Sequence, residues 1–206
     1  MTGIPGMILV TVIGYLLGSI SSGIILSRLF HGPDLRKVGS GSTGASNVLR
    51  TMGVKWGIIT LLCDFSKAAL SCLIAYWIVG TREAAMLAGL ACVIGHNWPI
   101  FFQLTGGKGV ASSIGVMLLT YPAWGAVSIG LCLLIIALTR FISLGSMSML
   151  VVFAILVTVL ESGGAWWIIL WAWTLALMCL YRHHGNIHRL LHGKERKLGE
   201  KEKIAK

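Results

Sequence analysis

Short polar clusters interrupt an otherwise apolar chain, and their residue types suit the binding of a phosphorylated anion. The first cluster, residues 39–50, reads GSGSTGASNVLR. Its glycines can turn backbone N–H groups toward one point and let an anion approach closely, and the guanidinium of Arg50 suits phosphate. A G-x-G-x-x-G spacing also marks dinucleotide-binding folds, but those need a preceding strand, and here an apolar run and a basic loop come first. The alternative interpretation is a flexible loop at a membrane surface.

The second cluster combines GHNWP at residues 95–99 with TGGKGVASS at residues 105–113. A nucleotide-binding P-loop needs Ser or Thr directly after the lysine, and Lys108 is followed by glycine. A Gly-Gly-Lys turn that opens a helix is still an anion site, because N–H groups, helix dipole and ammonium act together. Pro99 should end or kink a helix and could bring His96 toward this turn. His96 is then either a packing residue or a functional one.

Two further clusters carry weaker predictions. Residues 140–146 (RFISLGS) fit an interfacial anchor and a helix cap better than a ligand site. In residues 182–193, His183 and Asn186 share a helix face, although a basic amphipathic segment on anionic lipid is the alternative. The histidines lack Cys or carboxylate partners at zinc-ligand spacing, so we predict no metal site.

Apolar segments dominate the elements that must position these clusters. The 206 residues are 56% apolar and 12% charged, with a mean hydropathy of +0.84, whereas soluble domains are about a quarter charged. Backbone groups in hydrocarbon must pair internally, which favours helices, and each span needs about 20 residues. We therefore expect an all-α integral membrane protein. Its candidate spans are 5–27, 57–80, 84–104, 110–122, 124–139, 147–160 and 165–181, of which the fourth to sixth are short.

The charge distribution predicts an orientation. The net charge is +10, and fifteen of the 17 Lys and Arg residues fall on one side of the predicted spans. The positive-inside rule then places the N-terminus outside and the C-terminus in the cytoplasm, which requires an odd number of crossings. Seven crossings fit, and five would fit if the short segments pair differently. We expect one polytopic domain, 1–206, whose tail, 194–206, is solvated or lies on lipid.

The remaining polar and sulfur-containing residues receive structural interpretations. Asp64 and Lys67, at i and i+3 in the second span, should neutralise each other and lie outside the site. The five cysteines lie in apolar runs and read as small buried hydrophobes. No nucleophile elbow or Cys–His dyad is evident.

The clusters, taken together, resemble the bacterial acyl-phosphate:glycerol-3-phosphate acyltransferases of the PlsY type. The similarity covers residues 39–50, 95–111 and 183–195 in the family order, with departures at Ser42, where the family usually has Asn, and Ser46, where it usually has Thr. It implies about seven helices in the inner membrane, with the motifs facing the cytoplasm. It also implies that a fatty acyl group passes from acyl phosphate to the 1-hydroxyl of glycerol 3-phosphate. The products would be lysophosphatidate and phosphate, in phospholipid synthesis, without acyl-CoA or acyl carrier protein.

This interpretation assigns roles to particular residues. Lys108, His96 and His183 are the predicted catalytic residues, with Lys108 stabilising the oxyanion and the departing phosphate. A histidine or a phosphate oxygen of the substrate would take the hydroxyl proton, and we favour the substrate. The predicted phosphate-binding residues are Ser40, Gly41, Asn47, Arg50, Gly106, Gly107, Ser143, Ser146, Asn186 and Arg189.

The expected partners are the two substrates, membrane lipid and the enzyme that makes acyl phosphate; no cofactor and no nucleic acid is expected. The competing hypothesis is a transporter of a phosphorylated anion, whose entry the basic loops would form. It is disfavoured because the chain shows no internal repeat and no charged row through the bundle.

Overall fold

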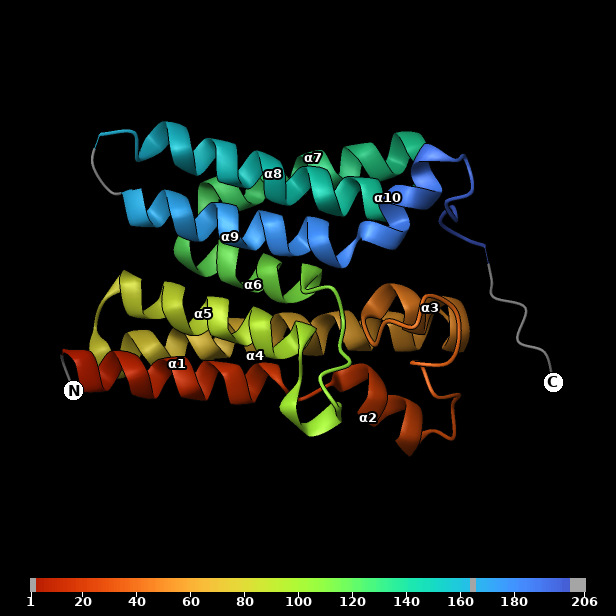
Figure 1. Cartoon of the computed structure of the whole chain (residues 1–206), viewed down its shortest axis with the longest axis horizontal. Helices are drawn as coiled ribbons and strands as arrows, with labels where there is room; N and C mark the ends of the chain where they lie inside the picture. The colour runs from red at the N-terminus through yellow and green to blue at the C-terminus, as the bar shows by residue number, and fades with distance from the viewer. Residues whose placement is uncertain (1–2, 164–165, 201–206) are drawn as a thin grey trace. The chain divides into compact units, whose positions relative to one another are not determined.

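The computed structural model describes residues 3–163 and 166–200, which divide into two compact units, one ending at Thr120 and one beginning at Tyr121. Both units are helical, as Figure 1 shows. The first contains α1 (Ile4–Gly18), α2 (Ser22–Leu29), α3 (Ala45–Met52), α4 (Val54–Val79), α5 (Arg82–Asn97), the short 3-10 helix η1 (Ile100–Phe102) and α6 (Val110–Thr120). The second contains α7 (Pro122–Thr139), α8 (Ile142–Leu160), α9 (Trp166–Arg182) and α10 (His184–Leu191).

Close packing of α1 against α5 organises the first unit. A Cβ on Gly14 would lie 2.3 Å from the carbonyl oxygen of Ala88, and one on Gly18 would lie 2.0 Å from that of Cys92. In the same way, a Cβ on Gly95 would lie 2.2 Å from the carbonyl oxygen of Tyr15 in α1. Small residues let two helix backbones approach where lipid offers no hydrophobic driving force. These glycines therefore set the position of the C-terminal end of α5, which carries His96.

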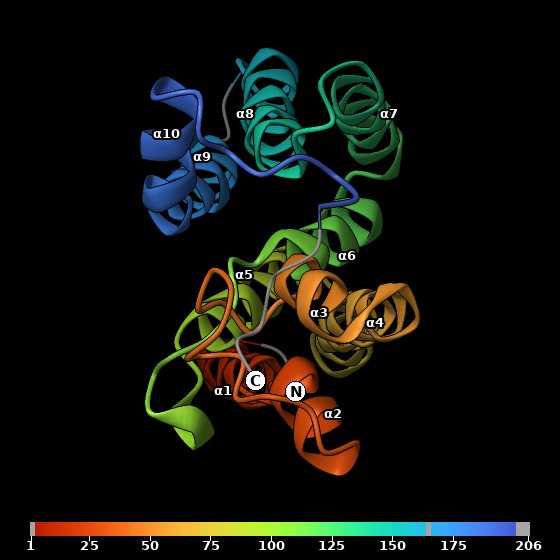
Figure 2. The same cartoon turned by 90° about the vertical axis from the view of Figure 1, so that its right-hand side faces the viewer.

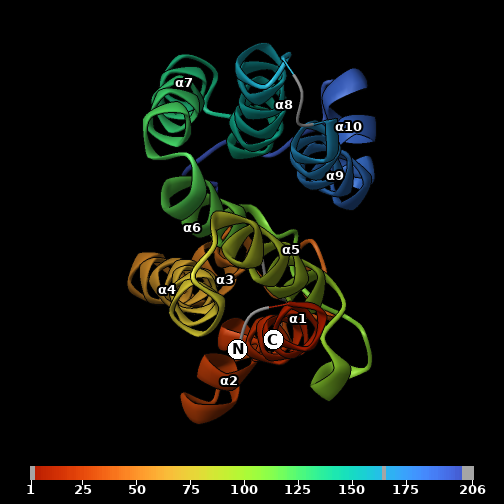
Figure 3. The same ribbon diagram turned by 90° about the vertical axis from the view of Figure 1, so that its left-hand side faces the viewer.

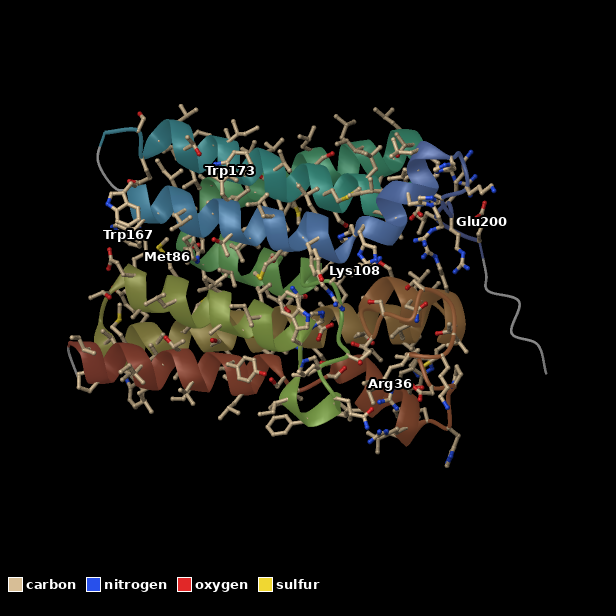
Figure 4. The ribbon with its side chains drawn as sticks, viewed as in Figure 1. Arg36, Met86, Lys108, Trp167, Trp173 and Glu200 are labelled. Atoms are coloured by element: carbon tan, nitrogen blue, oxygen red, sulfur yellow. The ribbon has the colours of Figure 1, made fainter. Side chains whose placement is uncertain are left out.

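The polar clusters of the first unit gather at one end of its long helices. Figure 1 shows α2, α3 and the loop after α5 at the same end of α1, α4 and α5. Arg36, labelled in Figure 4, lies in the loop between α2 and α3, and its hydrogen bond to Gln103 (3.4 Å) joins this loop to the one after α5. Its ion pair with Asp34 (2.9 Å) lies within its own loop. The predicted basic side thus corresponds, in this unit, to one end of the helices.

In the second unit α7, α8 and α9 run side by side, and α10 follows α9 at one end (Figure 3). An aromatic cluster fills the interior of this unit. Tyr121, Phe153 and Trp171 are all buried, with ring centroids 6.1–6.3 Å apart. Such edge-to-face and tilted pairs add to the burial of apolar area. The contact between Phe153 and Trp171 holds α8 against α9 near the start of α9, whereas α10 follows the other end of that helix.

The all-α membrane fold is confirmed, with corrections to individual segments. The first predicted span is broken at residues 19–21 between α1 and α2, and the third ends at Asn97 before Pro99. Within residues 3–163 and 166–200, five helical segments are long and apolar enough to cross a membrane, while α6 and α9 are shorter apolar helices. Seven crossings and the orientation of the termini remain predictions. Position 165, and Lys201, Lys203 and Lys206 of the predicted tail, lie outside the described residues.

Candidate active site

The first glycine cluster is a closed loop organised by Asn47. The side-chain amide of Asn47 donates to the carbonyl oxygens of Leu35, Val38 and Ser42 at 2.9–3.1 Å, and its oxygen accepts from the Ser40 N–H at 2.9 Å. Asn47 is 1% exposed. The loop itself uses these donors and this acceptor, so Asn47 shapes the turn, and its contact with phosphate stays a prediction.

Left-handed glycines complete this loop. Gly39 and Gly41 have φ of +63° and +69°, where a side chain is strained. The N–H of Gly41 donates to the Val38 oxygen at 3.1 Å, and its role in phosphate binding likewise stays a prediction. Helix α3 begins directly after the loop, and its half-buried Arg50 lies one turn beyond Asn47. Ser40 is half-buried on the same loop.

The second glycine cluster packs tightly on the end of α5. The Gly107 N–H donates to the His96 oxygen at 3.0 Å, so this N–H holds the turn, and its role as a phosphate donor stays a prediction. A Cβ on Gly106 would lie 2.1 Å from that same oxygen, and one on Gly107 would lie 2.0 Å from Nε2 of His96. The half-buried Lys108 follows at once, close to the start of α6 (Figure 4). Pro99 does end the helix, as predicted, and the chain returns to His96.

The two glycine clusters meet within the first unit. A Cβ on Gly44 would lie 3.9 Å from the Cα of Gly107. Since Gly44 directly precedes α3 and Gly107 precedes Lys108, the turn that opens the helix of Arg50 adjoins the turn that leads to Lys108. Neighbouring glycine turns of this kind can hold an anion.

The ionised pair in α4 belongs to this neighbourhood, contrary to the prediction. Lys67 Nζ lies 2.9 Å from an Asp64 carboxylate oxygen, which confirms the pairing. The same ammonium lies 3.1 Å from Nδ1 of His96 and 2.8 Å from the Ile20 oxygen. Asp64, Lys67 and His96 are all buried. Sequence spacing within α4 could reveal the pair but not its contact with α5.

Glu195 is the main feature of the second unit that the sequence did not assign. Its carboxylate accepts from Ser143 Oγ at 2.8 Å, Asn186 Nδ2 at 2.6 Å and Arg189 Nε at 2.8 Å. Three predicted phosphate ligands thus share an internal anion. Burial raises the pKa of Glu195, but the hydrogen bonds from Asn186, Ser143 and Arg189 outweigh it and hold the pKa below its usual value.

The start of the predicted tail is therefore part of the fold. Glu195 is 7% exposed, and Leu198 and Arg140 exchange two hydrogen bonds, from the Leu198 N–H at 2.7 Å and from Arg140 Nη2 at 2.8 Å. Figure 2 shows this segment crossing the end of α8 toward α7. The expectation of a solvated or lipid-bound segment does not hold for Glu195, which is buried and hydrogen-bonded, whereas Leu198 is exposed.

His183 and Ser146 are buried in the second unit. Nδ1 of His183 lies 2.8 Å from the Cys179 oxygen, so we assign the proton to Nδ1 and leave Nε2 as an acceptor in the neutral ring. The Cys179 sulfur also lies 3.4 Å from that nitrogen, a Cys–His contact that the sequence did not suggest. A protonated Nδ1 does not activate a thiol. Ser146 Oγ donates to the Ile142 oxygen at 2.8 Å, as a hydroxyl inside a helix does.

Comparison with known proteins places these features in one family. The family model described as glycerol-3-phosphate acyltransferase matches residues 8–193. The glycerol-3-phosphate acyltransferase of Thermoanaerobacter pseudethanolicus is 38% identical over 96% of this chain and 98% of its own. That of Alkaliphilus metalliredigens is 40% identical over the same shares.

Two solved structures are similar along almost the whole chain. Both are crystal structures of PlsY (YgiH), an integral membrane glycerol 3-phosphate acyltransferase. The glycerol 3-phosphate form has a TM-score of 0.86 at 35% identity, and the lysophosphatidic acid form has 0.83 at 34%. Each comparison covers 94% of this chain and 96% of the other.

Proposed function

The chain belongs to the glycerol-3-phosphate acyltransferase family, and from this premise we propose that its acyl donor is a fatty acyl phosphate. The acyl group passes to the 1-hydroxyl of glycerol 3-phosphate and gives lysophosphatidate and phosphate. The observation that carries this proposal is the close approach of the two glycine turns at Gly44 and Gly107, which brings the start of α3, the helix of Arg50, beside the turn that leads to Lys108. A site made of two cationic turns suits a reaction in which both substrates and both products carry phosphate.

Direct transfer fits the residues of the site. Acyl phosphate carries its own leaving group, so the reaction needs no covalent acyl-enzyme. The hydroxyl oxygen of glycerol 3-phosphate attacks the acyl carbonyl, the C–O bond to phosphate breaks, and phosphate departs with the electron pair. Lys108 and neighbouring N–H groups stabilise the oxyanion and the leaving phosphate. Arg50 and Ser40 hold a substrate phosphate from the first loop.

The hydroxyl proton passes to an oxygen of a substrate phosphate in this mechanism. Of the two histidines, His183 is the alternative acceptor, because its neutral ring has an unprotonated Nε2. Substitution of each histidine by alanine separates these cases. If His183→Ala abolishes turnover while substrate binding persists, the substrate is not the proton acceptor.

The cellular setting follows from the charge distribution. The basic loops and the tail carry most of the lysines and arginines, and the positive-inside rule puts them in the cytoplasm. We place the enzyme in the bacterial inner membrane with its site facing the cytoplasm. Acyl phosphate is amphiphilic and reactive, and the enzyme that makes it is the partner we expect.

The donor is tested with purified protein in detergent or lipid mesophase. We expect lysophosphatidate from acyl phosphate and glycerol 3-phosphate, and none when acyl-CoA or acyl carrier protein replaces acyl phosphate. Product formation from acyl-CoA alone as donor would overturn the proposed donor. Proteoliposomes loaded with glycerol 3-phosphate test the competing transporter, which predicts flux across the membrane without acyl transfer.

A further inference from the structure

A buried network of Asp64, Lys67 and His96 stands behind the Gly106–Gly107 turn in the first unit. Its members come from two helices, Asp64 and Lys67 from α4 and His96 from α5. Their exposed fractions are 1%, 8% and 6%. A buried ammonium is costly unless its donors are satisfied, so the hydrogen bonds around Lys67 constrain the groups that face it.

The ammonium of Lys67 has three hydrogens and three acceptors at hydrogen-bond distance. These are the Asp64 carboxylate at 2.9 Å, the Ile20 carbonyl at 2.8 Å and Nδ1 of His96 at 3.1 Å. Since Lys can only donate, Nδ1 must accept and so carries no proton. The Asp64 carboxylate lies farther from Nδ1, at 3.4 Å, and receives the lysine instead.

The other ring nitrogen then carries the proton of a neutral imidazole. Nε2 faces the glycine turn, because a Cβ built on Gly107 would lie 2.0 Å from it. The backbone of His96 holds the same turn through the bond from the Gly107 N–H. Both ends of His96 therefore act on the segment that leads to Lys108.

We propose that Asp64 and Lys67 are positioning residues that lock His96 in its neutral Nε2–H form, so that His96 donates a hydrogen bond toward the Gly-Gly-Lys turn and does not accept the substrate proton. Asp64 also accepts from Ser22 Oγ at 3.2 Å, and its carbonyl accepts from Ser112 Oγ at 3.2 Å. The network thus joins α2, α4, α5 and α6 around the turn. Its catalytic consequence rests on the proposed function, whereas the state of the ring does not.

Nitrogen NMR of the purified protein with 15N-labelled histidine tests the ring directly. The chain has six histidines, and the signals lost in His96→Gln identify the ring. We expect His96 to show an unprotonated Nδ1 and a protonated Nε2. A protonated Nδ1 would overturn the proposal whatever the enzyme catalyses.

Substitutions in α4 test whether Asp64 and Lys67 hold His96 in its neutral Nε2–H form. Lys67→Met should release the ring, so that its signals change, and should lower kcat/KM on the order of 10²-fold through misplacement of the turn. Because this variant leaves Asp64 buried and unpaired, the neutral double variant Asp64→Asn with Lys67→Met is measured beside it. Lys55→Met, at the exposed start of the same helix, is the matched control and should change neither readout. Unchanged ring signals in both Lys67 variants would contradict the lock.

Substitutions of His96 show whether its side chain acts as a hydrogen-bond donor or as a general base. Glutamine places an amide N–H near the position of Nε2, whereas asparagine reaches only the position of Nδ1. We expect His96→Gln to retain about tenfold more activity than His96→Asn, the scale of one hydrogen bond, with an unchanged pH profile. Equal loss in both variants, together with a pH profile that loses its acidic limb, would identify His96 as a base.

Discussion

The substrate-facing cations are few, although the chain carries 17 lysines and arginines. Arg189 bonds to Glu195 inside the second unit, and Arg36 pairs with Asp34. Lys108 directly follows the second glycine turn, and Arg50 lies on α3, which the first turn opens. We propose that specific phosphate recognition depends on these two side chains, while most of the positive charge orients the protein or holds its loops.

Lys108→Ala should lower kcat/KM at least about 10²-fold, the scale of losing one oxyanion donor. The lysine supplies the charge nearest the Gly-Gly turn, and a methyl group cannot replace it. The rate of phosphate release in the presence of glycerol 3-phosphate measures the loss. Lys55→Ala, at an exposed position, serves as the control and should retain the rate of the unmodified protein. A near-normal rate for Lys108→Ala would remove this lysine from the mechanism.

Cys179→Ala should leave turnover nearly unchanged, because direct transfer uses no thiol. The Cys179 sulfur lies 3.4 Å from Nδ1 of His183, but that nitrogen donates to the Cys179 carbonyl. Steady-state rates and the intact mass of the protein after incubation with acyl phosphate alone measure the effect. Loss of activity, with an acyl adduct on the unmodified protein that Cys179→Ala lacks, would establish a covalent route instead.

At the scale of elements, short glycine turns and the segment of residues 194–200, which we call the strap, hold the ends of the helices in place. The glycine turn at residues 106–107 leaves no room for a side chain because His96 fills the space. The strap closes the end of the second unit through the Glu195 carboxylate and through the two hydrogen bonds between Leu198 and Arg140. The turn and the strap each hold polar groups in a fixed position.

Gly107→Ala should reduce activity on the order of 10²-fold by displacing His96 or the turn. The added Cβ would meet Nε2 of His96 at 2.0 Å, a distance that real contacts do not reach. Gly130→Ala is the matched control, since a Cβ at this exposed position of α7 meets nothing within 4 Å. Kinetics and thermal unfolding are compared for both. Normal kinetics for Gly107→Ala would show that the turn adapts and does not position Lys108.

Glu195 should make the stability of the protein depend on pH. Its pKa is lowered on folding, so the ionised carboxylate stabilises the fold above its unfolded pKa of about 4.3. This contribution is lost as the pH falls through the lower folded pKa. Glu195→Gln should therefore lower the unfolding temperature near neutral pH, and the difference from the unmodified protein should shrink in acid.

Thermal unfolding in detergent between about pH 3.5 and 7 measures this difference. Glu200→Gln, at an exposed position on the same segment, is the control and should follow the unmodified protein. If Glu195→Gln unfolds at the same temperature as the unmodified protein at neutral pH, the carboxylate does not anchor the strap.

For the molecule as a whole, hydropathy predicted most of the fold because lipid demands long apolar helices. The predicted start of the sixth span at 147 was late, since the polar residues Ser143 and Ser146 lie within α8. Helix α3 was not predicted as a separate element, because short amphipathic helices carry little hydropathy, whereas the helical spacing of His183 and Asn186 anticipated the region of α10. The break between α1 and α2 at residues 19–21 was not predicted either, because the serines there gave no clear pattern.

The candidate site was predictable in its residue types and less so in its contacts. Glycine spacing indicated the two turns, yet the N–H groups of Gly41 and Gly107 bond to the protein's own carbonyls. Glu195 was visible as part of the family resemblance, but its contact with Ser143 spans 52 residues of sequence. Pairing across such distances depends on packing, which a local pattern does not contain.

The central claim is acyl transfer between two phosphorylated substrates, and one measurement tests it most directly. Purified protein is mixed with acyl phosphate, with and without glycerol 3-phosphate, and released phosphate and lysophosphatidate are quantified together. The account predicts phosphate release that depends on glycerol 3-phosphate and yields one lysophosphatidate for each phosphate. Phosphate release that is independent of glycerol 3-phosphate, without lysophosphatidate, would contradict it and leave a hydrolase.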